Sequence, residues 1–211
     1  MKPYDFVVFD CDGVILQSNQ VKSNAFAAAL TGEPQSAIDA FVAYHKANGG
    51  ISRYKKFAHY FEHMQPCQDA VPYIAQALER YAAIVQAELL TCPLIPGIEQ
   101  YLQQLQQAGI RCAVNSGGDE QELHGVFAAR KLAEYFQHIF GSPTGKQENM
   151  QRLKNLGFMQ GNGVMFGDSK SDWLAAQAFG LDFVFITHET EWHDEKPNNM
   201  HTLQSFLNIN C

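Results

Sequence analysis

The chain of 211 residues has a mass of 23.6 kDa, with 46% hydrophobic and 18% charged residues. This composition is typical of a globular protein with one domain, or one domain carrying an insertion, and excludes a mostly disordered chain. Twenty-two acidic residues against fifteen basic ones give a net charge of −7, which argues against nucleic-acid and anionic-membrane partners. No run of about 18 apolar residues occurs, so no transmembrane helix is expected.

The cysteines and the N-terminal residues indicate a compartment. Five cysteines are scattered along the chain and none forms a C-x-x-C pair, which favours neither a disulfide framework nor a structural zinc site. The opening residues MKPYDFVVFDCDG lack the apolar stretch of a secretory signal. Both observations predict a reducing, cytoplasmic location.

The first predicted element is a buried strand, and a series of helices follows it. Residues 4–10 (YDFVVFD) form an apolar run rich in aromatic and β-branched residues, which ends at the turn-prone Asp12-Gly13. No convincing strand interrupts the next part of the chain. Its predicted helices cover residues 24–30, 37–47, 53–64 and 71–90.

From Pro93 onward the pattern changes to alternating helices and strands. Such alternation predicts an α/β fold with a doubly wound parallel sheet, Rossmann-like in type. The sheet core would comprise residues 1–16 and 92–211, and residues 17–91 would form an inserted all-helical cap. After a helix at 97–108, strands are predicted at 110–115, near 138–141, at 163–167 and at 181–186, with helices between them.

Charge is distributed unevenly between these two parts. Residues 17–91 carry six basic and six acidic residues, so the core accounts for the whole net charge of −7. Within the insertion, residues 41–61 contain no acidic residue, but they include Lys46, Arg53 and the pair Lys55 and Lys56. This segment is either a solvated helix face or a source of cations for an anionic substrate.

Polar side chains follow the predicted strands at the edge of the sheet where ligands bind in such folds. Asp10 and Asp12 come after the first strand, Ser116 after the second and Asp168 after the strand at 163–167. Lys146 lies in the loop after the third strand, where it is expected to begin a helix. Residues far apart in the sequence are therefore predicted to meet at one edge.

These residue types together suit phosphoryl transfer. Carboxylates from Asp10, Asp12 and Asp168 offer the hard oxygen ligands that Mg²⁺ prefers. Asp10 would be the nucleophile that forms an aspartyl-phosphate, and Asp12 the general acid and base. Ser116 and Lys146 would hold the phosphoryl oxygens.

Four segments resemble the motifs of the haloacid dehalogenase superfamily, in the same order: FDCDGV (9–14), VNSGG (114–118), Lys146 and GDSKSD (167–172). The resemblance covers the core, and the helical insertion is similar to the family's small C1 cap. The run PGIEQYLQQLQQAGI resembles the phosphoglycolate-phosphatase-like branch.

This resemblance implies a role for each matching residue. Asp10 would be the nucleophile and Asp12 the acid and base. Mg²⁺ would be held by the Asp10 carboxylate, the main-chain carbonyl of Asp12 and Asp168, while Asp172 would reach metal-bound waters or orient Lys146. The phosphate would be bound by Ser116, Gly117 and Lys146.

Asp12 separates the branches of the family. Dehalogenases proper lack a carboxylate at this position and phosphonatases carry a small residue there, so both are disfavoured. The expected function is hydrolysis of a small phosphorylated metabolite, a sugar phosphate or a similar compound, by a Mg²⁺-dependent phosphatase. A β-phosphoglucomutase-like mutase is the alternative, although Lys22 stands where mutases carry a histidine. A receiver-like phosphoacceptor and a non-catalytic binding protein are less compatible with the order and completeness of the motifs.

The insertion segment NGGISRYKKF (48–57) resembles a loop and helix of phosphatase-like members from polysaccharide and sugar-nucleotide pathways. Gly49-Gly50 would let the loop bend toward the core. Arg53 and Lys56, one helical turn apart, are expected to contact a second anionic group of the substrate, and Lys55 to face solvent. The sequence leaves open whether the protein is a monomer or a homodimer.

Overall fold

Within residues 4–207 and 209, which this computed structural model describes, the chain forms a six-stranded sheet with the order β3-β2-β1-β4-β5-β6. All neighbouring strands are parallel, which confirms the doubly wound α/β sheet. The winding direction reverses at β1, between β2 and β4, and ligands bind at such switch points. The strands are β1 (Phe6–Phe9), β2 (Arg111–Asp119), β3 (His138–Ser142), β4 (Gly163–Gly167), β5 (Asp182–Ile186) and β6 (His201–Leu203).

Helices cover both faces of the sheet. Val7 and Phe9 of β1 belong to one hydrophobic cluster, whereas Phe6 and Val8 belong to the other, because successive side chains of a strand point to opposite faces. This burial on both sides explains why β1 is apolar at every position. The helices are α5 (Ile98–Gln107) and α6 (Glu120–Ala129), which pack with Phe9, and α7 (Lys146–Asn155) and α8 (Lys170–Ala178), which pack with Phe6.

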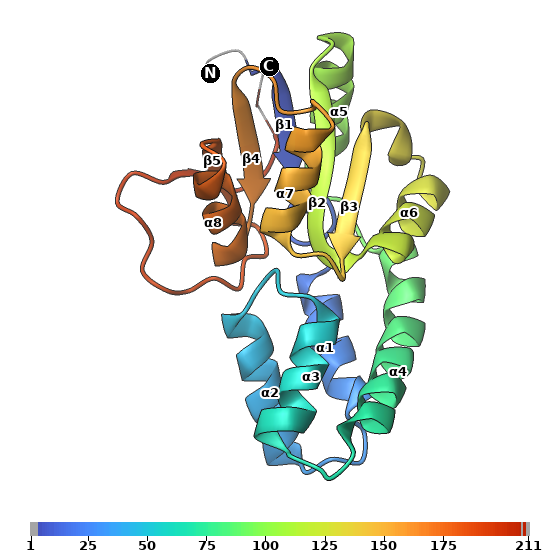
Figure 1. Cartoon of the computed structure of the whole chain (residues 1–211). Coiled ribbons are helices and arrows are strands. Elements are labelled where there is room, and N and C mark those ends of the chain that lie inside the picture. The colour runs from blue at the N-terminus through green and yellow to red at the C-terminus, as the bar shows by residue number, and fades with distance from the viewer. Residues whose placement is uncertain (1–3, 208, 210–211) are drawn as a thin grey trace.

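Between β1 and β2 the chain forms the expected helical insertion. In Figure 1 its helices lie together beyond the carboxyl ends of the strands, and the long α4 leads back to the sheet. Aromatic rings form its core, with Phe26 and Phe57 5.3 Å apart and Phe41 and Tyr60 5.0 Å apart between ring centroids. The division at residues 17 and 91 stays a prediction. The helices are α1 (Asn19–Ala29), α2 (Gln35–Ala47), α3 (Arg53–His59) and α4 (Ala70–Thr91).

The structure differs from the sequence-based expectations at three places. β6 is not predicted, because two of its three residues are exposed and the third is only half-buried, so they form no apolar run. The helix expected at 53–64 ends at His59 and continues as a π-helical turn, Tyr60–Met64. β2 extends beyond its expected end to Asp119, with a register shift against β3, so Ser116 lies inside this strand.

No helix in the described part of the chain is both long and apolar enough to span a lipid bilayer.

Candidate active site

Asp10 lies directly after β1, at the switch point of the sheet. Its backbone N–H donates a hydrogen bond to the carbonyl oxygen of Phe166 in the neighbouring β4 over 2.9 Å. Its side chain is almost fully buried, at 3% exposure. Because β1 and β4 run in parallel with Phe9 beside Phe166, Asp10 and Asp168 leave adjacent strand ends together.

Carboxylate oxygens of Asp10, Asp168 and Asp172 lie within 4.8 Å of one another. Lys146, the first residue of α7, lies among them: its Nζ is 2.9 Å from Oδ1 of Asp10 and forms an ion pair with Asp172. Burial, together with the charge of Asp172, raises the pKa of Asp10 to about 7. Burial and the charge of Asp10 raise the pKa of Asp168 as well. One ammonium group is therefore too little positive charge for three buried carboxylates.

The donor set of this cluster fits a divalent cation. Asp172 is already engaged, because Oδ1 pairs with Lys146 and Oδ2 accepts hydrogen bonds from the backbone N–H and hydroxyl of Ser169 over 3.1 and 2.5 Å. Asp10 and Asp168 are thus the carboxylates that remain for a metal. Hard carboxylate oxygens of this kind suit Mg²⁺. Asp172 contacts Lys146, and its role in orienting this lysine stays a prediction.

Asp12 points away from this acidic cluster. Its Oδ2 lies 2.5 Å from Nζ of Lys22 in α1, and its Oδ1 accepts a hydrogen bond from the hydroxyl of Ser18 over 2.6 Å. Burial opposes ionisation of Asp12, but Lys22 and Ser18 outweigh it and lower the pKa of this carboxyl. The two aspartates of the first motif therefore have environments that shift their pKa values in opposite directions, as separate chemical roles require.

Ser116 is fully buried and its hydroxyl accepts a hydrogen bond from the backbone N–H of Gly118 over 3.0 Å. It does not line the cavity described below, whereas Gly117 and Gly118 do. A Cβ atom at Gly118 would lie 3.3 Å from both Ser116 Oγ and Lys22 Nζ, so both groups lie close to Gly118 at the strand end. The main chain of Lys146 is fixed by Asn115, whose side chain donates a hydrogen bond to the Lys146 carbonyl oxygen over 2.9 Å.

The loop at Gly49-Gly50 of the insertion packs against the strand ends. A Cβ atom at Gly117 would lie 2.4 Å from the carbonyl oxygen of Gly50. Gly50 itself has φ +74°, and a Cβ there would lie 2.0 Å from Ser171 Oγ and 3.2 Å from Lys146 Nζ. Both positions require the absence of a side chain. The loop thus bends toward the core, as expected, and covers the site.

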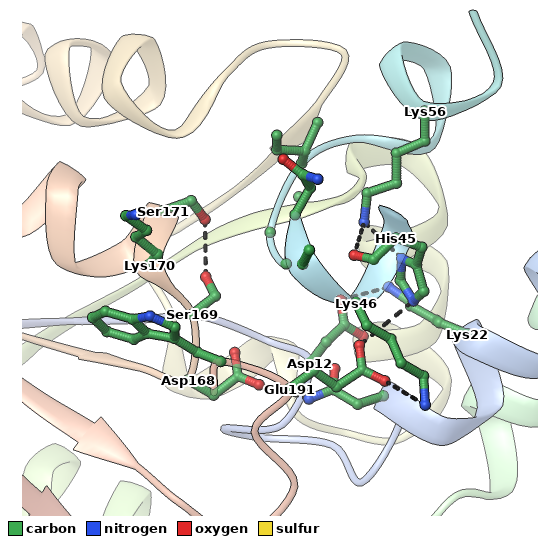
Figure 2. A pocket seen from close by; sticks show the side chains of 18 of the residues that line it. Asp12, Lys22, His45, Lys46, Lys56, Asp168, Ser169, Lys170, Ser171 and Glu191 are labelled. Carbon is green, nitrogen blue, oxygen red and sulfur yellow. Dashed lines mark hydrogen bonds and ion pairs between the residues drawn. The ribbon is translucent and has the colours of Figure 1, made fainter. Parts of the chain in front are cut away.

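A cavity of about 370 Å³ lies between the insertion and the sheet, and Asp10, Asp12 and Asp168 line its base. Its upper wall contains Lys56, which is 2% exposed (Figure 2). Lys56 Nζ lies 2.7 Å from Nδ1 of His45, whose Nε2 lies 3.0 Å from the hydroxyl of Ser23. That hydroxyl donates to Glu191 over 2.8 Å. The chain of contacts links the insertion to the segment between β5 and β6.

Burial and the positive charge of Lys22 lower the pKa of Lys56 to about 7, although Glu191 opposes them. Burial and the charge of Lys56 lower the pKa of His45 to about 2, so this imidazole is neutral. Neutral His45 can then accept from Lys56 at Nδ1 and donate to Ser23 at Nε2. Within the described residues, no carboxylate lies within ion-pair distance of Lys56.

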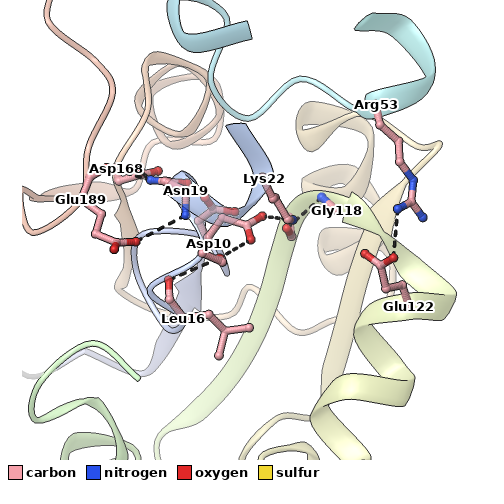
Figure 3. A network of polar contacts seen from close by, with 12 residues as sticks. Asp10, Leu16, Asn19, Lys22, Arg53, Gly118, Glu122, Asp168 and Glu189 are labelled. Carbon is pink, nitrogen blue, oxygen red and sulfur yellow. Dashed lines mark hydrogen bonds and ion pairs between the residues drawn. The ribbon is translucent and has the colours of Figure 1, made fainter. Parts of the chain in front are cut away.

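Arg53 is engaged differently from Lys56. Its guanidinium Nη1 lies 2.9 Å from Oε2 of Glu122, as Figure 3 shows, and Nη2 lies 3.7 Å from Asp119. The neighbouring Tyr54 donates its hydroxyl to Asp119 over 2.6 Å. These contacts join α3 of the insertion to α6 and its N-cap. Lys55 is exposed, in agreement with its expected orientation.

Several residues of the site were not singled out from the sequence. Asn19 donates a hydrogen bond to Asp168, and Lys22 pairs with Asp12. His45 and Glu191 both contact the hydroxyl of Ser23. No short motif contains them. Lys22 is the exception: the sequence marks it as a departure from the mutases but does not predict its ion pair with Asp12.

A switch-point aspartate lies beside a buried lysine and further carboxylates, beneath a helical insertion, and this set of groups is suited to phosphoryl transfer. The chain belongs to the haloacid dehalogenase-like hydrolase family, whose model matches residues 7–186. It is similar to a probable phosphoglycolate phosphatase of Pseudomonas putida, with 32% identity over 135 residues, 59% of this chain and 52% of that one. It thus spans about half the length of that relative.

A second relative, a phosphoglycolate phosphatase of Pseudomonas putida, is 28% identical over 191 residues, covering 86% of this chain and 69% of the relative. Among solved structures, CbbY from Rhodobacter sphaeroides in complex with phosphate has a TM-score of 0.76 and 19% identity, over 97% of this chain and 95% of that one. A β-phosphoglucomutase from Clostridium difficile has a TM-score of 0.71 and 16% identity, over 97% and 92%. These structures share the fold.

Proposed function

We propose that this protein is a Mg²⁺-dependent phosphatase that hydrolyses a small phosphorylated metabolite, a sugar phosphate or a similar compound. The observation that carries the proposal is the placement of Asp10. Its buried carboxylate lies 2.9 Å from Lys146 and lines a cavity of about 370 Å³ beneath the insertion. Ligand cavities range over roughly 300–1,000 Å³, so this one suits a small molecule.

The residues divide the reaction into two steps. In the first, an oxygen of Asp10 attacks phosphorus, the bond from phosphorus to the ester oxygen breaks, and Asp12 gives its proton to the leaving oxygen. In the second, Asp12 takes a proton from water, the water oxygen attacks the phosphorus of the aspartyl-phosphate, and Asp10 is released. Lys146, Ser116 and the backbone N–H of Gly117 are proposed to hold the phosphoryl oxygens.

Mg²⁺ would be held by the carboxylates of Asp10 and Asp168 and by the main-chain carbonyl of Asp12. When bound, it supplies the positive charge that the cluster lacks and offsets the charge of the phosphoryl oxygens. Asp172 keeps Lys146 in place.

The far end of the cavity supports a substrate with a second polar or anionic group. Lys56 is buried there without a carboxylate partner among the described residues. Its Nζ contacts Nδ1 and the carbonyl oxygen of His45, which leaves the third N–H of the ammonium form for a carboxylate, phosphate or hydroxyl of the substrate. The named relatives are phosphoglycolate phosphatases, and phosphoglycolate carries such a carboxylate. Arg53 already pairs with Glu122, and we propose that it closes the insertion over the substrate.

A β-phosphoglucomutase-like activity is the second candidate. The fold similarity to a β-phosphoglucomutase and the presence of both Asp10 and Asp12 favour it. A mutase needs its phosphoenzyme to survive until the intermediate rebinds. Lys22 stands where mutases carry a histidine and pairs with Asp12, which weighs against this alternative.

The test is release of inorganic phosphate from a panel of phosphate esters, including phosphoglycolate and hexose and pentose monophosphates, in Mg²⁺ or EDTA. We expect release only with Mg²⁺, loss of activity in Asp10→Asn, and full activity in the control Asp39→Asn, whose residue is exposed on α2. Activity that persists in Asp10→Asn or in EDTA contradicts the proposal. Isomerisation of a sugar phosphate that depends on a bisphosphate, with little phosphate release, would establish the mutase.

A further inference from the structure

Asn19 connects the first helix of the insertion to Asp168. Its side-chain Nδ2 donates hydrogen bonds to Oδ2 of Asp168 over 2.6 Å and to the main-chain oxygen of Glu189 over 3.0 Å, and its backbone N–H lies 3.3 Å from Oε2 of Glu189 (Figure 3). Asn19 is also the first residue of α1. Both hydrogens of the amide are therefore used, and one of them fixes a carboxylate oxygen of the acidic cluster.

The turn after Asp12 encloses this contact. Gly13 has φ +73°, and a Cβ atom there would lie 2.4 Å from Oδ2 of Asp168 and 2.5 Å from Nδ2 of Asn19. Asp168 is held at its main chain as well, because the hydroxyl of Thr190 donates to its carbonyl oxygen over 2.5 Å. Asp168, 5% exposed, is thus restrained at its side chain by Asn19 and the Gly13 turn and at its main chain by Thr190.

An asparagine is chemically suited to this position. Its amide donates a hydrogen bond but carries no charge, so it orients the carboxylate without neutralising it. Lys22 differs in this respect, because it pairs its full positive charge with Asp12. With Oδ2 of Asp168 bound to Asn19, Oδ1 is the oxygen left to face a cation.

We propose that Asn19 is a positioning residue of the metal site, which holds Asp168 in the rotamer that binds Mg²⁺. The inference rests on the metal site of the proposed function. Carboxylates that bind metals are themselves hydrogen-bonded, and loss of such a partner typically costs about 10–100-fold in metal affinity. Asn19 belongs to the insertion, so the metal site depends on a residue outside the sheet core.

The test measures Mg²⁺ binding without substrate, by calorimetric titration of the full chain and by the rise in Tm with Mg²⁺ concentration. Asn19→Ala is expected to bind Mg²⁺ about 10-fold more weakly than the wild type. Asn19→Ser, which also lacks the amide, should bind Mg²⁺ as weakly as Asn19→Ala. The control Asn24→Ala changes an exposed asparagine of the same helix and should leave the affinity unchanged.

A second control separates the amide contact from docking of the helix. Glu189→Ala removes the carboxylate near the Asn19 backbone but keeps the amide contact with Asp168, so its Mg²⁺ affinity should stay within about 2-fold of the wild type. The inference is overturned if Glu189→Ala and Asn19→Ala lose equal Mg²⁺ affinity. It is also overturned if Asn19→Ala lowers Tm in EDTA but leaves the Mg²⁺ affinity unchanged, because the role of Asn19 would then be structural.

Activity assays show which proposal has failed. If the wild type binds Mg²⁺ but hydrolyses no phosphate ester, the proposed function fails while the role of Asn19 is still measured. If the wild type binds no Mg²⁺, the role of Asn19 is refuted. Where activity is present, kcat of Asn19→Ala should recover at saturating Mg²⁺, because the variant changes only occupancy of the site.

Discussion

The ammonium group of Lys22 lies 2.5 Å from Oδ2 of Asp12, in an ion pair that crosses from the insertion to the sheet core. Lys22 is 8% exposed, so the pair is shielded from solvent. The pair favours the ionised form of Asp12. For Asp12 to carry the proton that the leaving oxygen needs, the charge of Lys22 must be shared with the phosphate of the substrate.

Lys22→Met should destabilise the protein, because it leaves Asp12 as a buried carboxylate without its counter-ion. Breaking such a pair costs about 3 kcal/mol in the free energy of unfolding. Without Lys22 the pKa of Asp12 rises above that in the wild type, so the variant gains a proton as pH falls. The loss should therefore be largest near neutral pH and smaller near about pH 5. Urea unfolding at both pH values measures it; a pH-independent loss would contradict the pairing.

Asp10→Asn should stabilise the metal-free protein. The pKa of Asp10 is raised from 3.8 to about 7, so between these two pH values the folded state binds a proton that the unfolded state lacks. The free energy of unfolding in EDTA should therefore fall as pH rises through this range, by up to about 4 kcal/mol, in the wild type but not in the variant. Saturating Mg²⁺ should remove this difference. Parallel pH profiles in EDTA would show that Asp10 is ionised without a metal.

The Arg53–Glu122 ion pair should hold the insertion against α6. Arg53→Ala and Glu122→Ala are each expected to lower kcat/KM about 10-fold, equivalent to about 1.4 kcal/mol, and the double variant should lose little more. A double-mutant cycle on the best substrate measures this coupling. If Arg53→Ala alone lowers kcat/KM, Arg53 contacts the substrate, as the sequence suggested.

Lys56 should set the affinity for the far end of the substrate. Lys56→Met removes the amine but keeps an apolar side chain of similar length, and we expect KM to rise about 10-fold with a smaller change in kcat. Lys55→Met is the matched control, since the adjacent Lys55 is exposed. Equal effects of the two substitutions would exclude a specific role for Lys56.

Gly117 should be required for the insertion to close. A Cβ there would lie 2.4 Å from the carbonyl oxygen of Gly50, so Gly117→Ala must push the loop away from the site. Displacements of this kind can lower kcat/KM by roughly 100-fold. Gly125→Ala on α6 is the control: nothing lies within 4 Å of its added Cβ, and it should stabilise the helix by up to about 1 kcal/mol. Full activity in Gly117→Ala would contradict a loop closed in this way.

The strand pattern and the motifs were readable because their signals are local. An apolar run before Asp10, another before Asp168 and the helix start at Lys146 each occupy a few consecutive residues. The parallel arrangement then requires their ends to meet at one edge. β6 was missed because a three-residue edge strand with two exposed residues has no hydrophobic period of its own.

By itself, the sequence determined the fold class, the inserted helices and the residues at the strand ends, since each follows from periodicity and short-range chemistry. Only the tertiary structure decided the partners of those residues. Lys22 reaches Asp12, Asn19 reaches Asp168 and Glu122 reaches Arg53, and each contact depends on how the insertion lies on the sheet. Long polar side chains can reach many partners, and their pairing is fixed only when packing brings one of them within hydrogen-bond distance in a buried place.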